Sequence, residues 1–300
     1  MTGIERVGVV GCGLMGAGIA EVCARAGVPV TVVERDARAA EAGRLRIGRS
    51  LDRATARGRL TAEQHAGAAA LITVVDRIEA LHEHDLVIEA VAEDEALKRD
   101  VFSRLDAVVT GEHAVLATNT SSLPIVRLAA ATGRPERVVG VHFFNPVPVL
   151  PLVELVPSLL TSPATAARAE TFVTDTLGKE VVRTRDKAGF VVNALLVPYL
   201  LAAVRMVESG GATAEDVDRA MVHGCAHPLG PLALADLIGL DTTRAIAESL
   251  YAEFREPQYS PPPLLKRMVE AGLLGRKSGR GFHAYDAGPR RGEAAPAVRP

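Results

Sequence analysis

The stretch Val7-Gly8-Val9-Val10-Gly11-Cys12-Gly13-Leu14-Met15-Gly16 decides the fold of the N-terminal half. An apolar, strand-like run at residues 5–10 leads into it, a helical stretch continues to about residue 26, and a second apolar run follows at residues 28–33. A lone G-x-G-x-x-G pattern is weak evidence, but here the first strand, the helix and an acid after the second strand, Glu34, are all in place. The sequence therefore predicts a βαβ unit whose first turn binds a dinucleotide.

Each glycine of this turn has its own physical reason. Gly11 permits a tight turn, Gly13 lets the backbone approach a pyrophosphate, and Gly16 allows close packing of the helix on the strand. The helix that starts here offers unpaired N–H groups and a partial positive charge to the phosphates. The predicted cofactor-binding turn comprises Gly11, Gly13, Leu14, Met15 and Gly16.

Glu34 bears on the choice of cofactor. A carboxylate at this position would accept hydrogen bonds from the adenosine ribose hydroxyls and repel a 2′-phosphate, which favours NAD. Arg35, the next residue, could meet such a phosphate. NAD is therefore the expected cofactor, and NADP stays possible.

The remaining apolar runs complete an α/β domain. We expect further strands at residues 71–75, 85–91, 114–117 and 180–183, together with the two runs that carry His142 and Glu154. Glu93 and Lys98 lie at or just beyond the carboxyl end of the second of these strands, where open α/β sheets bind ligands. The expected N-terminal domain spans residues 1–186 and contains a mostly parallel, Rossmann-like sheet.

Hydroxyl side chains cluster behind the strand at residues 114–117. Thr118-Asn119-Thr120-Ser121-Ser122 could bind a substrate oxygen at the end of the sheet, or it could cap the helix that follows. The residues alone leave both interpretations open.

The run Val139-Gly140-Val141-His142 delivers a histidine to the end of a strand. Pro146, Pro148 and Pro151 then exclude a helix, and a second apolar run carries one acid, Glu154. A histidine and a carboxylate on adjacent rigid elements are the parts of a general base and its orienting partner. A strand-capping histidine and an acid that faces solvent on an edge strand are the alternative.

Residues 35–59 are rich in arginine, with eight arginines against three acids and a local net charge of +5. Arg46, Ser50, Arg53 and Arg57 are four, three and four residues apart, so a helix places them on one face. A cationic face beside a dinucleotide site suits a second, phosphate-rich ligand. An ordinary solvated helix is the alternative.

The pattern changes after about residue 186, and helical periodicity prevails to about residue 271. We therefore expect an all-helical C-terminal domain at residues 187–286. Its first helix, from Asn193 to about Glu208, is apolar nearly all round, which fits either a subunit interface or a central core helix. Residues 287–300 are expected to form a disordered tail.

Bulk properties limit the partners and the compartment. The net charge is −2, so no global field favours nucleic acid or an anionic membrane, and no apolar run reaches the roughly 18 residues that cross a bilayer. The three cysteines form no C-x-x-C pair, which fits a reducing compartment. We expect a cytoplasmic protein with neither a nucleic-acid nor a membrane partner.

The histidines other than His142 suggest no site. His223 and His227 flank Cys225 without the spacing of a zinc site, so no metal is expected. The others in polar stretches, expected at the surface, are His65, His82, His84 and His113.

Five separated motifs resemble those of the L-3-hydroxyacyl-CoA dehydrogenases. They are Gly11 to Gly16 with Ala17-Gly18-Ile19-Ala20, Asn119-Thr120-Ser121-Ser122-Leu123, His142-Phe143-Phe144-Asn145-Pro146, Gly189-Phe190-Val191-Val192-Asn193, and Lys277-Ser278-Gly279-Arg280-Gly281-Phe282. Gly230-Pro231 and Gly239-Leu240-Asp241 continue the match, which covers residues 4–286. The length is similar to that of the short 3-hydroxybutyryl-CoA dehydrogenases. The resemblance implies NAD-dependent interconversion of a hydroxyacyl-CoA and an oxoacyl-CoA by a homodimer.

The resemblance also implies a role for each matching position. It implies catalysis by His142 with Glu154 as its orienting partner, and contacts to the 3-oxygen of the substrate from Ser121 and Asn193. The cofactor contacts that it implies, besides the glycine turn, are Glu34, Glu93, Lys98, Ser121 and Asn145. The CoA contacts are Ser50, Arg57 and Ser121. Two positions depart from the family's usual residues: Arg57 stands for lysine and Glu34 for aspartate.

Two other functions stay open. The same chemistry could act on a hydroxyacyl group carried by an acyl carrier protein, because the arginine-rich face could meet an acidic protein. Alternatively, the fold could serve as a non-catalytic NAD-binding protein with a structural or sensing role, although the complete set of expected site residues argues against this.

Overall fold

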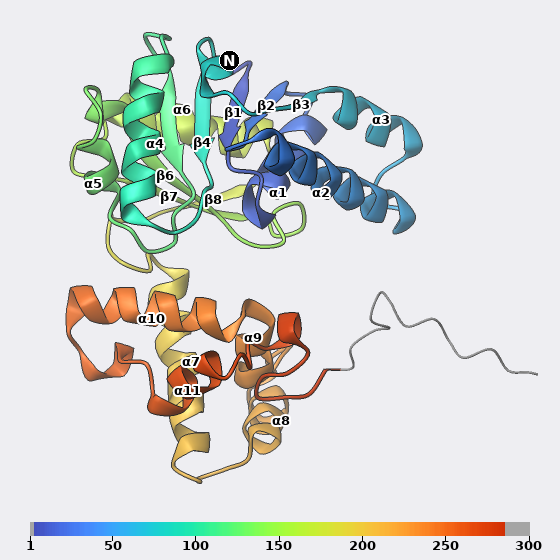
Figure 1. Ribbon diagram of the computed structural model, residues 1–300. Coiled ribbons are helices and arrows are strands. Elements are labelled where there is room, and N and C mark those ends of the chain that lie inside the picture. The colour runs from blue at the N-terminus through green and yellow to red at the C-terminus, as the bar shows by residue number, and fades with distance from the viewer. Residues whose placement is uncertain (1–2, 286–300) are drawn as a thin grey trace, which may run out of the picture. The chain divides into compact units, whose positions relative to one another are not determined.

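The computed structural model describes residues 3–285 and divides into two compact units, which meet in sequence between Val191 and Val192. Figure 1 shows both units, and each is described by itself below. Residue 286 and the tail expected at residues 287–300 lie outside the described residues.

The first unit is built on one eight-stranded sheet with the order β3-β2-β1-β4-β5-β6-β7-β8. Its strands are β1 (Val7–Val10), β2 (Val30–Val33), β3 (Ile72–Val75), β4 (Leu86–Glu89), β5 (Val115–Thr118), β6 (Val138–Phe143), β7 (Leu152–Pro157) and β8 (Glu180–Arg183). All neighbours are parallel except β6 and β7. The predicted α/β class with a mostly parallel sheet is confirmed.

Helices cover both faces of this sheet, because alternate strand residues point to opposite sides. Val9 enters the core on one face and its neighbour Val10 the core on the other. The first core receives side chains from α1 (Leu14–Arg25), α2 (Ala37–Ala56), α3 (Ala62–Ala70), α6 (Pro163–Thr171) and the π-helical turn Phe172–Thr176. The second receives them from the 3₁₀ turn Ile78–Leu81, α4 (Glu95–Val108) and α5 (Ile125–Ala129).

The glycine turn connects β1 to α1 under tight steric limits. Gly11 has φ +92°, a backbone conformation that favours glycine. A Cβ added at Gly16 would lie 1.9 Å from the carbonyl oxygen of Gly11, whereas a Cβ at Gly13 would lie in open space. The turn therefore tolerates a larger residue at Gly13 but not at Gly16.

The second unit is helical. Its helices are α7 (Val192–Glu208), α8 (Ala214–Cys225), α9 (Pro231–Ile238), α10 (Leu240–Phe254) and α11 (Pro263–Glu270), with short 3₁₀ turns at Pro257–Tyr259 and Arg276–Ser278. Gly239, with φ +104°, separates α9 from α10. The expected all-helical class is confirmed.

Two buried carboxylates fasten the end of this unit. Asp236, 1 % exposed, accepts hydrogen bonds from the N–H groups of Phe282 and His283 and from the Tyr285 hydroxyl, at 2.9–3.0 Å. Asp218 accepts a hydrogen bond from His283 Nε2 at 2.7 Å and also caps the first N–H groups of α9. The last described segment is therefore held by side chains of α8 and α9.

One surface expectation is wrong. His84 is expected at the surface, but it is only 7 % exposed. It follows the 3₁₀ turn Ile78–Leu81, and its backbone N–H donates a hydrogen bond to the carbonyl oxygen of Leu81. Its burial lowers its pKa. None of the helices between residues 3 and 285 is long and apolar enough to cross a membrane.

We predict that Gly16→Ala destabilises the protein by about 1–3 kcal/mol, because the added methyl group has to displace backbone. The free energy of unfolding from urea titration measures this. Gly13→Ala is the matched control and should stay within about 0.5 kcal/mol of wild type. Equal stability of the two variants would contradict the packing described for this turn.

Candidate active site

His142 and Glu154 face each other across the one antiparallel strand pair of the sheet. The register pairs the two residues directly, and His142 Nδ1 lies 2.7 Å from Glu154 Oε2. His142 is 6 % exposed and Glu154 is fully buried. The second carboxylate oxygen, Oε1, accepts the N–H of Val191 at 2.9 Å. The histidine and carboxylate expected to form a dyad are therefore in contact.

Aromatic rings and a clamped loop surround the dyad. The imidazole of His142 packs against the rings of Phe144 and Phe190, with centroids 4.6 and 5.5 Å away. The loop between β6 and β7 carries exposed Asn145, which precedes a cis proline. Lys179, 9 % exposed, donates from Nζ to the carbonyl oxygens of Val147 and Leu150 at 2.8 and 2.7 Å. The proline-rich loop is thereby tied to the segment before β8.

Residues 120–122, here called the 120–122 loop, are gathered by the carboxylate of Glu93. Its Oε1 accepts the N–H groups of Ser121 and Ser122 at 2.9 and 3.1 Å, and the hydroxyls of Thr120 and Ser122 at 2.5 and 3.0 Å. Ser121 Oγ lies 3.4 Å from the same oxygen. Partial burial raises the pKa of Glu93, but the Lys98 ammonium and these donors outweigh it and lower the pKa below its ordinary value.

The helix after this loop is capped by another residue. Asp186 accepts the N–H groups of Ile125 and Val126, the first of α5, at 2.8 and 2.9 Å. Burial raises the pKa of Asp186 although both hydrogen bonds act against this. The capping role that the sequence left open for residues 118–122 therefore belongs to Asp186.

Lys98 is enclosed within the protein. It is 1 % exposed, and its Nζ lies 2.7 Å from Glu89 Oε1 and 3.3 Å from Glu93 Oε2. Glu89, the last residue of β4, is fully buried and was not singled out from the sequence. Two of the residues expected to contact a cofactor, Glu93 and Lys98, thus lie together at the carboxyl end of the sheet. Only Glu93 of the two is exposed, so a direct contact from Lys98 stays a prediction.

The glycine turn opens onto a cavity of about 480 Å³. It is lined by Val10, Gly11, Gly13, Val33, Glu34, Arg35, Asp76, Ile78, Ala90, Val91, Ala92, Leu97, Asp100, Val101 and Arg104. Among the described residues no side chain caps the start of α1, so its first N–H groups are available to phosphate. Leu14 is 65 % exposed there. Glu34 Oε1 accepts the N–H of Cys12 at 2.6 Å, which sets its carboxylate beside the turn.

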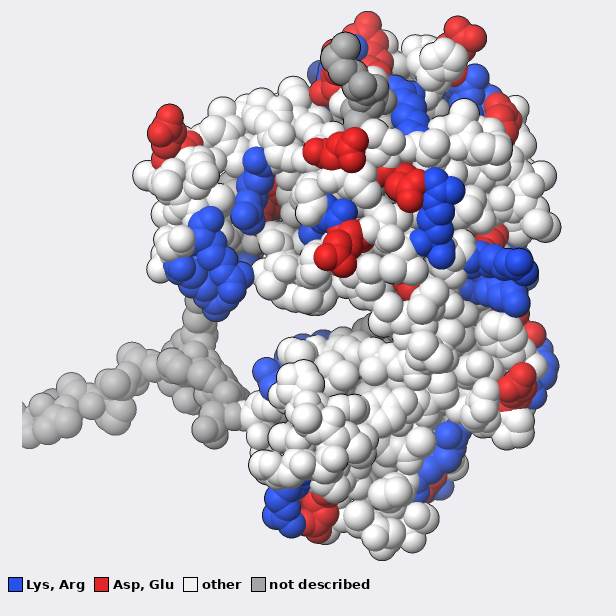
Figure 2. Space-filling model, turned by 180° about the vertical axis from the view of Figure 1, so that it is seen from behind, with Lys and Arg blue, Asp and Glu red and all other residues white. Residues whose placement is uncertain are grey.

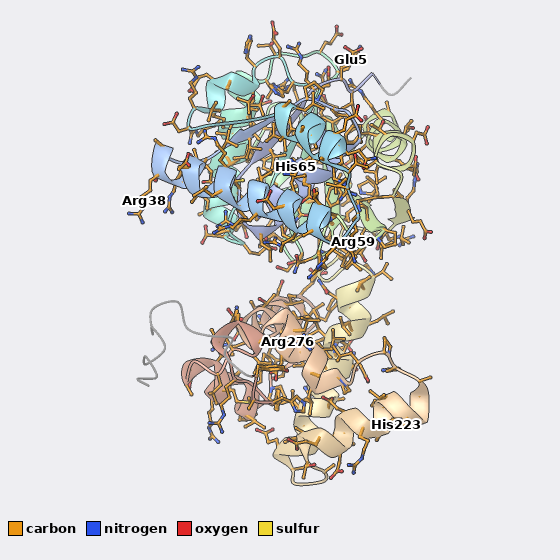
Figure 3. The ribbon with its side chains drawn as sticks, turned by 90° about the vertical axis from the view of Figure 1, so that its right-hand side faces the viewer. Glu5, Arg38, Arg59, His65, His223 and Arg276 are labelled. Atoms are coloured by element: carbon orange, nitrogen blue, oxygen red, sulfur yellow. The ribbon has the colours of Figure 1, made fainter. Side chains whose placement is uncertain are left out.

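The arginine-rich segment forms α2, which ends one residue before Arg57. Figure 3 shows this helix between the labelled Arg38 and Arg59. Arg46 donates to the carbonyl oxygen of Cys12, so it is engaged with the glycine turn. Ser50 is half-buried, and Arg57 is exposed.

Asn193 lies in the second unit, at the second residue of α7, and is half-buried. The structure therefore brings together His142 with Glu154 and Ser121 with Glu93 and Lys98, all in the first unit. Residues 3–285 contain no cluster of three side chains suited to a metal ion.

Three residues of the site were missed from the sequence. Glu89 could have been predicted from the sequence, because it directly follows the apolar residues of a buried strand and is therefore expected to be buried with them. Asp186 and Lys179 had none, because each acts on a segment far away in the chain.

Comparison with known proteins identifies the family. The family description "3-hydroxyacyl-CoA dehydrogenase, NAD binding domain" matches residues 6–187, and "3-hydroxyacyl-CoA dehydrogenase, C-terminal domain" matches residues 189–285. The chain belongs to the 3-hydroxyacyl-CoA dehydrogenase family. It is an NAD-dependent oxidoreductase, and its first unit is the NAD-binding domain.

Individual relatives of this dehydrogenase are similar along nearly their whole length. A 3-hydroxybutyryl-CoA dehydrogenase of Mycobacterium tuberculosis is 61 % identical over 282 residues, which cover 94 % of this chain and 99 % of the relative. The mitochondrial hydroxyacyl-coenzyme A dehydrogenase of Mus musculus is 42 % identical over 290 residues, which cover 94 % and 91 %. The crystal structure of (S)-3-hydroxybutyryl-CoA dehydrogenase PaaH1 from Ralstonia eutropha matches with a TM-score of 0.88 at 44 % identity, covering 94 % of this chain and 99 % of that one.

The lowered pKa of Glu93 generates a pH prediction. A carboxyl group whose pKa is lower in the folded than in the unfolded state adds stability that is complete above its unfolded pKa. This stability is lost as the pH falls through the folded value. Glu93→Gln should therefore lose less stability than wild type between pH 6 and pH 3, measured by urea unfolding. Thr120→Val removes one of the donors that lower the pKa of Glu93, so the folded-state pKa rises and the loss of stability is complete at a higher pH. Parallel curves for wild type and Glu93→Gln would contradict the assignment.

Proposed function

We propose that this dehydrogenase interconverts a short-chain L-3-hydroxyacyl-CoA, similar to 3-hydroxybutyryl-CoA, and the 3-oxoacyl-CoA. The observation that carries the proposal is the buried contact of 2.7 Å between His142 Nδ1 and Glu154 Oε2. The names of the Mycobacterium and Ralstonia relatives support the short acyl chain.

The dyad supplies the acid–base step. Glu154 accepts a hydrogen bond from the Nδ1–H of His142, which fixes the tautomer and leaves the Nε2 lone pair to take the hydroxyl proton of the substrate. Bound NAD supplies the acceptor for the hydride, with its two electrons, that leaves C3. Glu154 then stabilises the imidazolium that forms, and in the reductive direction His142 returns the proton to the oxygen.

Ser121 and Asn193 are proposed to hold the 3-oxygen of the substrate. Ser121 is fixed by its backbone N–H on Glu93, so its hydroxyl starts from a defined position. Asn193 offers an amide donor at the start of α7. Donors placed where negative charge develops would polarise the ketone in the reductive direction.

The end of α2 is proposed to hold the phosphate-bearing part of CoA through Ser50 and Arg57. A guanidinium grips a phosphate as a fork, where the lysine usual at this position would act as a point charge. Arg53 and Arg59, four and two residues from Arg57 in the chain, are also exposed. An acyl carrier protein is the second candidate carrier, because the same exposed cations would attract its acidic surface.

A homodimer through the helical unit is also proposed. Leu195 and Met206 of α7 and Leu237 of α9 are 72 %, 51 % and 52 % exposed. Figure 2 shows a face of the helical unit with few charged side chains. Exposed apolar side chains on neighbouring helices are typical of an obligate interface.

Replacing either member of the dyad tests the proposed chemistry. His142→Gln should lower kcat with NADH and acetoacetyl-CoA by about 10²–10⁴-fold, because the proton donor is lost. Glu154→Gln should lower kcat by roughly 10²-fold or more with a modest change in KM. His113→Gln, at an exposed histidine of the same unit, is the control. Near-full activity of His142→Gln would contradict the mechanism. If the wild-type protein is inactive with NADH and acetoacetyl-CoA, a non-catalytic NAD-binding protein is favoured.

A substrate panel tests the carrier. Thioesters of four to sixteen carbons, on CoA and on an acyl carrier protein, should show the highest kcat/KM for short chains on CoA. Arg57→Ala should raise KM for acetoacetyl-CoA by roughly tenfold and leave KM for acetoacetyl-pantetheine unchanged, because the latter lacks the nucleotide phosphates. Arg38→Ala, at the other end of α2 (Figure 3), should change neither. A preference for carrier-protein thioesters would shift the function to the second candidate.

A further inference from the structure

Glu89 lies at the centre of the carboxyl edge of the sheet. It ends β4 and pairs with Val10 of β1 on one side and with Thr118 of β5 on the other. The chain leaves β1 toward β2 and leaves β4 toward β5, so the strand order reverses at this point, where such sheets bind ligands. Glu89 nevertheless cannot touch a ligand, because it is 0 % exposed.

The two oxygens of Glu89 serve two different segments. Oε1 accepts Lys98 Nζ and the N–H of Val91, both at 2.7 Å. Lys98 is thereby shared between Glu89 and Glu93, whose Oε2 is 3.3 Å from the same ammonium. This first arm fixes the Lys98 ammonium and, through it, the Glu93 carboxylate.

The second arm runs toward the catalytic histidine. Glu89 Oε2 accepts the Thr118 hydroxyl at 2.7 Å, and Thr118 Oγ1 in turn accepts the N–H of Thr120 at 3.2 Å. Between them, the Asn119 side chain accepts the N–H of Phe143, the residue after His142, at 2.8 Å. A line of hydrogen bonds thus joins Glu89 to the 120–122 loop through Thr118, and the intervening residue Asn119 makes a separate hydrogen bond to β6.

Stability alone does not explain this arrangement. Removing two charges from water is expensive, and well-packed apolar residues of similar volume are often as stable as a buried ion pair or more so. Breaking one partner is costly because it leaves an uncompensated buried charge. The pair of Glu89 and Lys98 therefore adds little stability, but Glu89 fixes several hydrogen-bond donors at the edge of the sheet where ligands bind. We explain the pair by the geometry that it imposes on these donors.

We propose that Glu89 is a positioning residue of the reaction, which orders the cofactor side of the site through Lys98 and Glu93 and the substrate side through Thr118 and the 120–122 loop. Both sides are therefore set before either ligand binds. The inference rests on the proposed function for the role of Ser121, whereas the cofactor arm rests only on NAD binding.

The cofactor arm is tested without any acyl substrate. Glu89→Gln should raise the dissociation constant of NADH, measured by fluorescence titration, by about tenfold or more. The double variant Glu89→Leu/Lys98→Met removes both charges, so it should recover the thermal stability that Glu89→Gln loses. Because Lys98 is itself an expected cofactor contact, the NADH affinity of the double variant is compared with that of Lys98→Met, which it should not exceed. If affinity returns together with stability, Glu89 is merely structural and the proposal is overturned. Should Glu89→Gln fail to fold, Glu89→Asp decides, because it keeps the charge but shortens its reach to Lys98. It should weaken NADH binding, and wild-type affinity in a folded Glu89→Asp would overturn the cofactor arm.

The substrate arm is tested by a double-mutant cycle. Thr118→Val removes one hydroxyl from the line and should lower kcat several-fold while NADH affinity stays near wild type. The double variant Thr118→Val/Ser121→Ala should have a kcat at least threefold higher than the product of the two single effects predicts, because both substitutions act on the same loop. Independent effects would overturn this arm.

A control separates these results from general damage. Asp106→Asn weakens the ion pair with Arg134, which ties α4 to the loop before β6 and makes no contact with Glu89 or its partners. It should leave NADH affinity unchanged, and a loss as large as that of Glu89→Gln would overturn the proposal. If wild type binds NADH but turns over no thioester, the proposed function fails while the cofactor arm is still decided.

Discussion

The antiparallel pairing of β6 with β7 is the constraint on which the site depends. Every other neighbour in the sheet is parallel, so its residues need a long crossover to return to the same edge. β7 instead starts at the edge where β6 ends, and its third residue, Glu154, falls opposite the fifth residue of β6, His142. The short contact between the two side chains follows from this register. A slip by one residue would turn Glu154 to the other face of the sheet.

Three carboxylates near the carboxyl edge of the sheet hold the irregular segments of the site. Glu89, Glu93 and Glu154 each accept backbone N–H groups as well as side-chain donors. Such a carboxylate satisfies its own lone pairs and the polar backbone of an irregular segment in one place. The loops around the cofactor and substrate are thereby held without regular secondary structure, and their side chains point in defined directions.

The sequence predicted those features that local patterns determine. The βαβ unit, the glycine turn and the histidine run are continuous in the chain, and periodicity placed their elements within a few residues. The pairing of His142 with Glu154 could be anticipated because only a short proline-rich loop separates them. The cap on α5 could not, since Asp186 lies 61 residues from Ile125, and neither could the burial of His84 or the break at Gly239. These depend on contacts between distant segments, which no local pattern encodes.

The fastening of the last described segment to Asp236 has a consequence for biosynthesis. The N–H groups that satisfy this carboxylate belong to residues 46 and 47 positions further along the chain. While the ribosome is still making that segment, α9 carries a carboxylate whose partners do not yet exist, so it has to remain hydrated. The helical unit can therefore complete its core only after residue 283 has been made, whereas the sheet of the first unit has all its strands once Arg183 has been made.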